Sequence, residues 1–252
     1  MDIVFLGSGS LAVPLKEFLS TKYNSKIIPL RDTNTDEFKN LSNGSKSDKI
    51  YIDLMDPNKI DSNTKIEFLK KANKFRKIIS ASSNTKQYIY FSSANLYLPT
   101  FGKIFDDDQI LTNTKCGYLT LKKETESFLK NLPLPLCICR IPNIWGHKSK
   151  KSFFSDLIYS YQKKLKIKYM ESDKEVISFI NIFDLSILIG LAIQKKTLGT
   201  LNLSTDSFDS RYNLKAKVNK ENTLRINDLK GIRLSSQVID WKKYFDKRRL
   251  PF

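Results

Sequence analysis

The sequence is poor in the residues that build metal sites and disulfide frameworks. It contains 3 cysteines and 1 histidine among 252 residues. An odd number of cysteines argues against a disulfide framework. Cys137 and Cys139 alternate within "LCICR", which predicts that both lie on one face of a buried strand. With His147 as the single histidine, sites built on several histidines are disfavoured, and we expect core cysteines and no bound metal.

Long apolar runs are also missing. A membrane-spanning helix needs about 18 or more apolar residues in a row. The best candidate, "FINIFDLSILIGLAI", is interrupted by Asn181 and Asp184. The first residues, "MDIVFLG", show neither the basic start nor the cleavage site of a secretory signal. These features predict a cytoplasmic protein without membrane insertion.

Acidic residues are outnumbered by basic ones. The chain has 43 Lys and Arg against 26 Asp and Glu, a formal net charge of +17. Such an excess suits nucleic acid or a substrate that carries phosphates. The basic residues are mostly lysines spread along the whole chain, with one local cluster in "WKKYFDKRRLPF". We therefore expect a small phosphate-bearing substrate and no nucleic-acid partner.

Short apolar runs alternate with amphipathic segments over the first 145 residues. The strands expected are "DIVFLG", "KIIPL", "DKIYIDL", "QYIYFSS" and "LCICRI". The helices expected are "LAVPLKEFLS", "TKIEFLKKANKFRKIIS" and the segment that contains Tyr118 and stops before Pro133. Near-continuous apolar strands separated by helices predict an α/β fold with a Rossmann-type, doubly wound parallel sheet.

The pattern loosens from about residue 145. Helices are expected at "SFFSDLIYSYQKKL" and "DLSILIGLAIQKK", and strands at "KEVISFINI" and "TLNLS". From residue 205 onward the chain is polar and irregular. We divide the chain into a sheet domain at 1–145 and a smaller lobe at 146–252, with elements of the lobe crossing back to the sheet.

A glycine-rich loop follows the first predicted strand. Gly7 permits a tight turn, Gly9 allows the backbone to approach a pyrophosphate, and the small Ala12 lets the next helix lie close to the strand. Ser10 and Leu11 complete this loop. The phosphates would lie at the helix N-terminus, where backbone N–H groups favour anions. The loop predicts a dinucleotide site, although a tight turn with nothing bound has the same sequence.

Tyr118 and Lys122 share one face of a predicted helix. Residues at positions i and i+4 are neighbours on a helix surface. An ammonium at about 4 Å from the phenol, at an effective dielectric near 20, favours the phenolate by roughly 4 kcal/mol. The pair can act as a proton-transfer device, or the two residues can simply share a helix face.

Several motifs together resemble the extended short-chain dehydrogenases/reductases. "GSGSLA", "YIYFSSANLY", "GYLTLKKE", "RIPNIWG" and "ISFINIFDLSILI" occur in the order and approximate spacing of that family, over roughly residues 1–204. The family includes nucleotide-sugar epimerases, dehydratases and reductases. The resemblance implies an NAD(P)-dependent oxidoreductase that acts on a nucleotide-activated sugar.

The resemblance also implies roles for individual residues. Ser93, Tyr118 and Lys122 match the catalytic serine, the acid/base tyrosine and the lysine that holds the nicotinamide ribose. Arg140 matches a residue beside the nicotinamide and the substrate phosphates, and Asp184 a structural helix cap. Further cofactor and substrate contacts are expected at Leu54, Met55, Pro142, Asn95, Asn143 and His147.

Two features depart from the family pattern. The usual G-x-x-G-x-x-G spacing has Ser10 and Val13 in its second and third glycine positions. Where relatives usually have small residues after their fourth strand, this chain has Met55-Asp56-Pro57. Bulky side chains there would crowd a cofactor, so a catalytically degenerate NAD(P)-binding protein stays open as an alternative.

A few positions narrow the choice of reaction. Ala94 and Asn95 follow Ser93 where dehydratases carry carboxylates, which disfavours dehydration. The short connection "RDTNTDEFKNLSNGSKSD" favours a keto-sugar reductase of the dTDP-4-dehydrorhamnose reductase type, with an epimerase as the alternative.

Arg31 follows the strand "KIIPL" and can bind a 2′-phosphate, which favours NADP(H). Asp32 in that place would favour NAD(H). The sequence leaves monomer and homodimer open.

Overall fold

The structure is a computed structural model of the 252-residue chain. It describes residues 1–29, 34, 36, 38–39, 47–56, 62–97, 117–145, 160, 176–204, 208–210 and 233–234. Arg31, Asp32 and His147 lie outside these residues, as does nearly all of the helix expected at 152–165.

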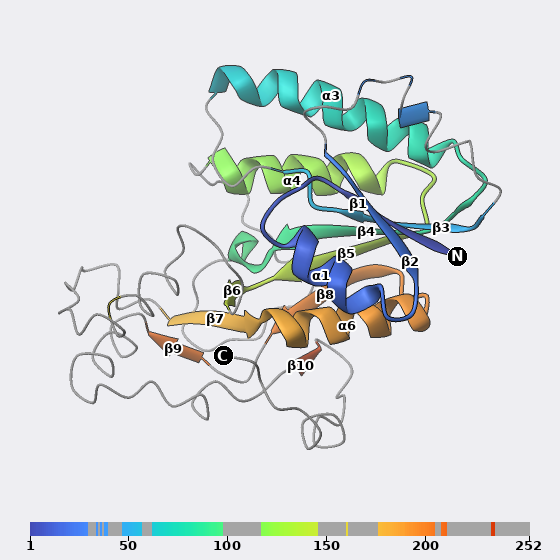
Figure 1. Cartoon of the computed structure of the whole chain (residues 1–252). Helices are drawn as coiled ribbons and strands as arrows, with labels where there is room; N and C mark the ends of the chain where they lie inside the picture. The colour runs from blue at the N-terminus through green and yellow to red at the C-terminus, as the bar shows by residue number, and fades with distance from the viewer. Residues whose placement is uncertain are drawn as a thin grey trace.

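The central feature is a seven-stranded sheet in the order β10-β8-β5-β4-β3-β1-β2 (Figure 1). The strands are β1 (Asp2–Leu6), β2 (Asn24–Ile28), β3 (Lys49–Asp53), β4 (Thr85–Ser93), β5 (Leu136–Ile141), β8 (Gly199–Ser204) and β10 (Arg233–Leu234). Neighbouring strands are parallel except for β10, which pairs antiparallel with β8. The predicted parallel sheet is confirmed.

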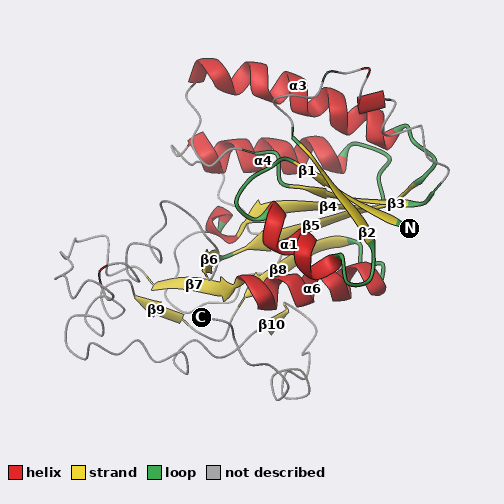
Figure 2. Cartoon of the chain, viewed as in Figure 1, coloured by secondary structure: helices red, strands yellow, loops and turns green. Residues whose placement is uncertain are grey.

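Helices cover both faces of this sheet (Figure 2). One face packs on α1 (Ala12–Leu19) and α6 (Ile182–Gln194), and the other on α3 (Ser62–Ser80) and α4 (Gly117–Lys130). The alternation of β1 shows why both faces need cover. Ile3 and Phe5 belong to the core on the α1–α6 side, whereas Val4 and Leu6 belong to the core on the α3–α4 side. This is the doubly wound arrangement expected of near-continuous apolar strands.

Core packing also places the two cysteines as predicted. Cys137 and Cys139 of β5 are fully buried on the α1–α6 side, with their sulfur atoms 3.8 Å apart and both thiols free.

The edge strand β2 differs from its prediction. The apolar run "KIIPL" predicted a strand at 26–30, but β2 runs from Asn24 to Ile28 and pairs along its whole length with β1. Pro29 follows directly, and proline has no N–H for a ladder. The strand end therefore lies two residues earlier than the argument about Arg31 assumed.

Elements after residue 145 join the main sheet and, together with β6, form a smaller one. β8 pairs with β5, and α6 packs against α1. A second sheet has the order β6-β7-β9, with β6 (Asn143–Trp145), β7 (Val176–Asn181) and β9 (Phe208–Ser210). β9 and β10 lie in the part predicted to be irregular. The division at 145 stays a prediction, and the crossing back that was expected is seen in β8 and α6.

The start of α6 corrects one detail. Asp184 was expected to cap this helix, but Asn181 is the cap, because its side-chain oxygen accepts from the backbone N–H of Phe183 at 2.8 Å. Asp184 lies in the first turn of α6, where its negative charge suits the helix dipole.

Candidate active site

The strand order reverses between β1 and β3, and the glycine loop lies at this point. β1 is followed along the chain by β2 on one side, while β3 and all later strands of the main sheet lie on the other. Ligands of open α/β sheets bind in the crevice at such a switch point, outside the carboxyl ends of the strands. Gly7, which directly follows β1, therefore stands where a nucleotide cofactor is expected.

Gly7 is required by the local backbone. Its φ is +100°, a conformation that side chains rarely adopt, and an added Cβ would lie 2.9 Å from the carbonyl oxygen of Leu54. The Gly7 N–H donates to the Ile28 carbonyl at 2.8 Å, and Leu54 N–H donates to Leu6 at 2.9 Å. This glycine thus lets the ends of β1, β2 and β3 converge.

Gly9 has a different environment. It is exposed, its φ is not positive, and a Cβ added there would meet nothing within 4 Å. Ser10 is exposed and Leu11 half-buried, and Leu11 caps α1 without a side-chain hydrogen bond. The loop before α1 is therefore open to a ligand.

The small residue of the glycine motif is placed as expected. Ala12 is fully buried at the start of α1, whereas Val13 is 52% exposed. Because Ala12 makes the close approach, Val13 does not obstruct the packing of the helix.

Met55 and Asp56 do not project into open space above the sheet. Met55 is 7% exposed and packs in the core on the α3–α4 side, and Asp56 is 8% exposed and paired with buried cations. Leu54 is partly buried against the opposite core. The expected crowding by the Met55 and Asp56 side chains is therefore not observed, since both turn inward.

Ser93 lies at the carboxyl end of β4, and Lys122 of α4 contacts this strand near its end and lies beside the Tyr118 ring. Ser93 ends the strand, is 5% exposed, and its Oγ accepts from the Asn95 N–H at 3.2 Å at the start of a short 3₁₀ helix, η1 (Ala94–Leu96). Lys122 Nζ donates to the Phe91 carbonyl, two residues before Ser93, at 2.6 Å. The same ammonium lies 5.6 Å from the centre of the half-buried Tyr118 ring.

Lys122 has a partner that sequence analysis missed. Its Nζ lies 3.3 Å from Asp56 Oδ2, and Asp56 Oδ1 accepts from Arg76 Nη2 at 2.9 Å. Arg76 Nε in turn donates to Asp53 Oδ2 at 2.9 Å. Tyr90 donates its hydroxyl to Asp56. These residues form what we call the Asp56 network, which joins the end of β3 to β4, α3 and α4.

Electrostatics keep Asp56 ionised. Burial acts to raise the pKa of Asp56, but the charges of Lys122 and Arg76 and the hydrogen bond from Tyr90 outweigh it, so the pKa lies below its ordinary value. Burial, followed by the charge of Asp56, raises the pKa of Tyr90 well above its ordinary value. Asp56 is therefore a carboxylate, and the Tyr90 phenol stays a donor.

A second buried network fixes Arg140. Arg140 is fully buried, and its Nη2 donates to Glu126 Oε2 of α4 at 2.8 Å. Its Nη1 donates to the Tyr97 hydroxyl at 2.5 Å, and Tyr97 donates to Asn202 of β8. The Arg140 guanidinium thus joins α4, β5 and β8. It is not exposed where it could bind a substrate phosphate.

The other predicted contacts flank this edge. Asn95 is exposed in η1, Pro142 is buried, and Asn143 is half-buried at the start of β6. Over the described ranges, no group of three or more His, Cys, Asp or Glu side chains is arranged to hold a metal ion. In the same ranges, no helix is long and apolar enough to cross a membrane.

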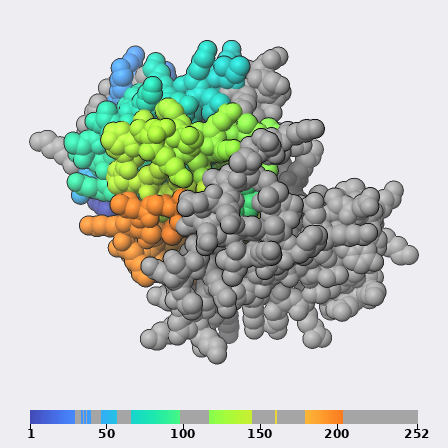
Figure 3. Space-filling model, turned by 180° about the vertical axis from the view of Figure 1, so that it is seen from behind, coloured from blue at the N-terminus to red at the C-terminus, as the bar shows by residue number. Residues whose placement is uncertain are grey.

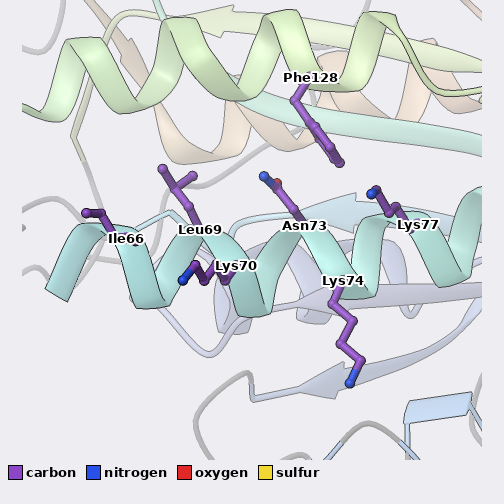
Figure 4. A pocket seen from close by; sticks show the side chains of 7 residues that line it. All are labelled: Ile66, Leu69, Lys70, Asn73, Lys74, Lys77 and Phe128. Carbon is purple, nitrogen blue, oxygen red and sulfur yellow. The ribbon is translucent and has the colours of Figure 1, made fainter.

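A surface pocket lies away from this edge, between α3 and α4. The two helices lie side by side on the face seen in Figure 3. Phe128 of α4 extends toward α3, and Figure 4 shows it opposite Asn73 and Lys77. The groove has a volume of about 490 Å³ and is also lined by Ile66, Leu69, Lys70 and Lys74. It is an apolar groove with lysines and carries no residue of the predicted site.

Comparison with known proteins identifies the fold. No family model matches the sequence, and no curated protein matches it. Among solved structures, dTDP-4-dehydrorhamnose reductase from Bacillus anthracis in complex with NADP has a TM-score of 0.72 at 19% identity, over 86% of this chain and 80% of that one. The fold is that of the nucleotide-sugar reductases and epimerases.

Two epimerases are similar to nearly the same extent. UDP-glucuronic acid 4-epimerase from Bacillus cereus in complex with NAD has a TM-score of 0.70 at 14% identity, covering 87% of this chain and 83% of that chain. UDP-glucose 4-epimerase from Thermotoga maritima with UDP-glucose has a TM-score of 0.67 at 12% identity, covering 86% and 81%. The predicted resemblance to the extended short-chain dehydrogenases/reductases is thereby confirmed for the fold.

Proposed function

We propose that this protein is an NAD(P)H-dependent oxidoreductase that reduces a keto group of a nucleotide-activated sugar, with Tyr118 as the proton donor. The observation that carries the proposal is that Lys122 contacts Phe91, two residues before Ser93 at the end of β4, and lies beside the Tyr118 ring, on the edge where the glycine loop opens. Structural neighbours that bind NADP, NAD or UDP-glucose support the same class of ligands.

The residues present fit a dinucleotide. A Cβ at Gly7 would collide with Leu54, while the space over Gly9 is open, so the loop is tight against the sheet and free on its outer side. Gly7, Gly9, Ser10, Leu11 and Ala12 would hold the pyrophosphate at the start of α1. The backbone at Leu54, Met55 and Pro142 would border the cofactor farther along the sheet, because the Met55 side chain packs in the core on the α3–α4 side. When bound, the cofactor supplies the hydride.

The protein's own residues handle the proton. A ketone that gains a hydride needs a proton at its oxygen, and the Tyr118 hydroxyl is the donor. Ser93 donates a hydrogen bond to the same oxygen and stabilises the charge that develops there. The Lys122 ammonium, fixed against Phe91 and beside the Tyr118 ring, stabilises the phenolate left behind. Asn95, Asn143 and His147 are the proposed substrate contacts.

The test is turnover with a panel of keto-sugar nucleotides. Wild-type protein should consume NADPH with at least one of them, and Tyr118→Phe should lose about 10²–10⁴-fold in turnover while it retains cofactor affinity. Tyr23→Phe is the matched control, because Tyr23 precedes β2 at the opposite end of the sheet. Near-wild-type turnover in Tyr118→Phe would contradict the assignment.

An epimerase is the second candidate, because both neighbouring epimerases share the fold over the same part of the chain. An epimerase with bound NAD would interconvert two nucleotide-sugars without net consumption of NADPH. Product analysis of the same panel in the absence of added reductant distinguishes the two reactions.

NADP(H) is the proposed cofactor, because Arg31 can bind its 2′-phosphate. β2 ends at Ile28, so Arg31 is the third residue after the strand and Asp32 the fourth. The pair still follows the strand whose end faces the ribose in this fold, and a guanidinium there binds a 2′-phosphate. Arg31→Ala should weaken NADPH binding and leave NADH binding unchanged. Equal affinities for both cofactors in the wild type would refute the preference.

A further inference from the structure

Lys122 is buried together with a carboxylate that is itself fixed from several sides. Only 5% of Lys122 is exposed, and its ammonium contacts Asp56 Oδ2 at 3.3 Å and the Phe91 carbonyl at 2.6 Å. Arg76 holds Asp56 Oδ1, and Tyr90 donates to Asp56 Oδ2. Each carboxylate oxygen therefore has a defined partner, and Asp56 presents a fixed negative charge to Lys122.

The network is balanced in charge. Asp53 and Asp56 face Arg76 and Lys122, so two carboxylates meet two cations in a buried region. Asp53 also accepts from the Tyr88 hydroxyl at 2.7 Å and from the Met55 N–H at 3.0 Å. A buried cation without a counter-charge is strongly disfavoured. Removal of Asp56 would therefore leave Lys122 as the excess charge.

We propose that Asp56 is a positioning residue, which holds the Lys122 ammonium between β4 and the Tyr118 ring. The arrangement is specific to Asp56, since Asp53 reaches Arg76 but no contact joins it to Lys122 among the described interactions. For its catalytic consequence the inference rests on the proposed function, because it concerns the lysine that supports Tyr118.

The groups around Lys122 come from four elements. Asp53 and Asp56 lie at the end of β3, Tyr88 and Tyr90 on β4, Arg76 on α3, and Tyr118 on α4. The next buried charge on α4, Glu126, is paired with Arg140 at 2.8 Å. Asp56 is thus the carboxylate in direct contact with the ammonium, and loss of its charge should act on Lys122 first.

The experiment follows the position and mobility of the Lys122 side chain at neutral pH by NMR of the lysine side chains, assigned with Lys122→Met. In Asp56→Asn the Lys122 ε-methylene signals should sharpen and move toward those of exposed lysines, because the ammonium has lost its contact at 3.3 Å. Asp53→Asn is the matched control, with an equally buried side chain and the same Arg76 partner, and its Lys122 signals should stay near their wild-type positions. Unchanged Lys122 signals in Asp56→Asn, or equal changes in both variants, would overturn the proposal.

Catalysis provides a second measurement. In Asp56→Asn kcat should fall while the KM for the sugar nucleotide stays near its wild-type value, because the ammonium is no longer held in one position beside the Tyr118 ring. A kcat unchanged from wild type would contradict this role. If neither wild type nor variant turns over any keto-sugar nucleotide, the proposed function fails, while the NMR comparison still decides the role of Asp56.

A double substitution controls for a loss of stability in Asp56→Asn. Asp56→Asn/Lys122→Met removes both charges, so it should unfold at higher denaturant concentration than Asp56→Asn, which keeps an uncompensated cation. A double variant that is no more stable than Asp56→Asn would overturn the pairing.

Discussion

At the scale of single residues, Gly7 and Gly9 separate two requirements that one motif combines. Gly7 has a positive φ and no room for a Cβ, because the Leu54 carbonyl lies in the way. Gly9 has neither constraint. The first glycine is therefore needed for folding, and we infer that the second is needed for ligand approach.

Alanine substitutions test this separation. Gly7→Ala should destabilise the protein by about 1–3 kcal/mol, the usual cost of a residue held in a sparsely populated backbone conformation. Gly9→Ala should leave stability within about 0.5 kcal/mol of wild type, as for surface changes, and should weaken NAD(P)H binding. Denaturant unfolding and cofactor titration of both variants provide the comparison. Equal losses of stability would show that the two positions are not distinct.

The candidate trio of Ser93, Tyr118 and Lys122 was predicted from sequence, but the buried charges beside Lys122 were not. Tyr118 and Lys122 stand out because their spacing has a chemical meaning. Arg76 resembles any charge in a lysine-rich helix, although it stands four residues after Ala72 and three before Ile79, on the buried face. That position was the available signal. Its carboxylate partners come from another part of the chain and are brought close only by tertiary folding.

At the scale of elements, buried ion pairs fasten helices to strands. Glu126 and Arg140 join α4 to β5, with Ser92 donating to Glu126 Oε1 at 2.5 Å and Tyr97 extending the network to β8. Burial acts against the charge of Arg140, but the hydrogen bond and the charge of Glu126 raise its pKa overall. The Arg140 guanidinium therefore stays charged.

Removing one partner should be costly. Arg140→Met leaves Glu126 buried without its cation, and such losses typically amount to about 3–5 kcal/mol. Glu126→Leu/Arg140→Met removes both charges and should recover much of that loss. Urea unfolding of the three proteins gives the values. A double variant as unstable as the single one would show that packing, not charge, dominates at this site.

The Asp56 network predicts how stability depends on pH. The pKa of Asp56 is lowered on folding from its ordinary value of 3.8, so the unfolded chain binds more protons in this range and stability rises with pH. The contribution is fully present above about pH 4 and is lost as the pH falls through the folded value.

Denaturant unfolding across the acid range checks this sign. The stability advantage of wild type over Asp56→Asn should be largest near neutral pH and should shrink below about pH 4. Asp48→Asn is the control, because Asp48 is about half exposed and forms a surface pair with Lys86 that should contribute little. An advantage that stays constant with pH would contradict an ionised Asp56.

The elements themselves were largely predictable, and the exceptions have physical reasons. "LCICRI" predicted β5 at its observed bounds, because every residue of this buried strand except Arg140 is apolar. β2 was misplaced because Asn24 and Ser25 of an edge strand are polar, while Pro29 interrupts the apolar run that seemed to mark it. β9 and β10 escaped prediction, since strands of two or three residues have no periodicity.

At the scale of the whole molecule, the parallel sheet is assembled from distant parts of the chain. β8 lies next to β5, pairing Gly199 with Cys137, and α6 covers the core that β1, β3, β4 and β5 share. The predicted division at 145 therefore separates strands that pair directly in the sheet.

A fragment of residues 1–145 tests the independence of the first part. It lacks β8 and α6, so one edge of β5 and the apolar face under α6 would be exposed, and we expect an aggregated or partly folded product. Circular dichroism and size-exclusion chromatography, with the full chain as control, check the expectation. A monomeric, cooperatively folding fragment would establish 1–145 as a domain.

The pairing of β5 with β8 also sets the order of events during synthesis. The chain leaves the ribosome from its N-terminus, and β5 has to wait until β8, which begins at Gly199, has emerged. Long-range parallel pairing is slow, and unpaired edges invite association with other chains. For that interval the nascent chain carries an open strand edge, which is when chaperone binding should matter most for its yield.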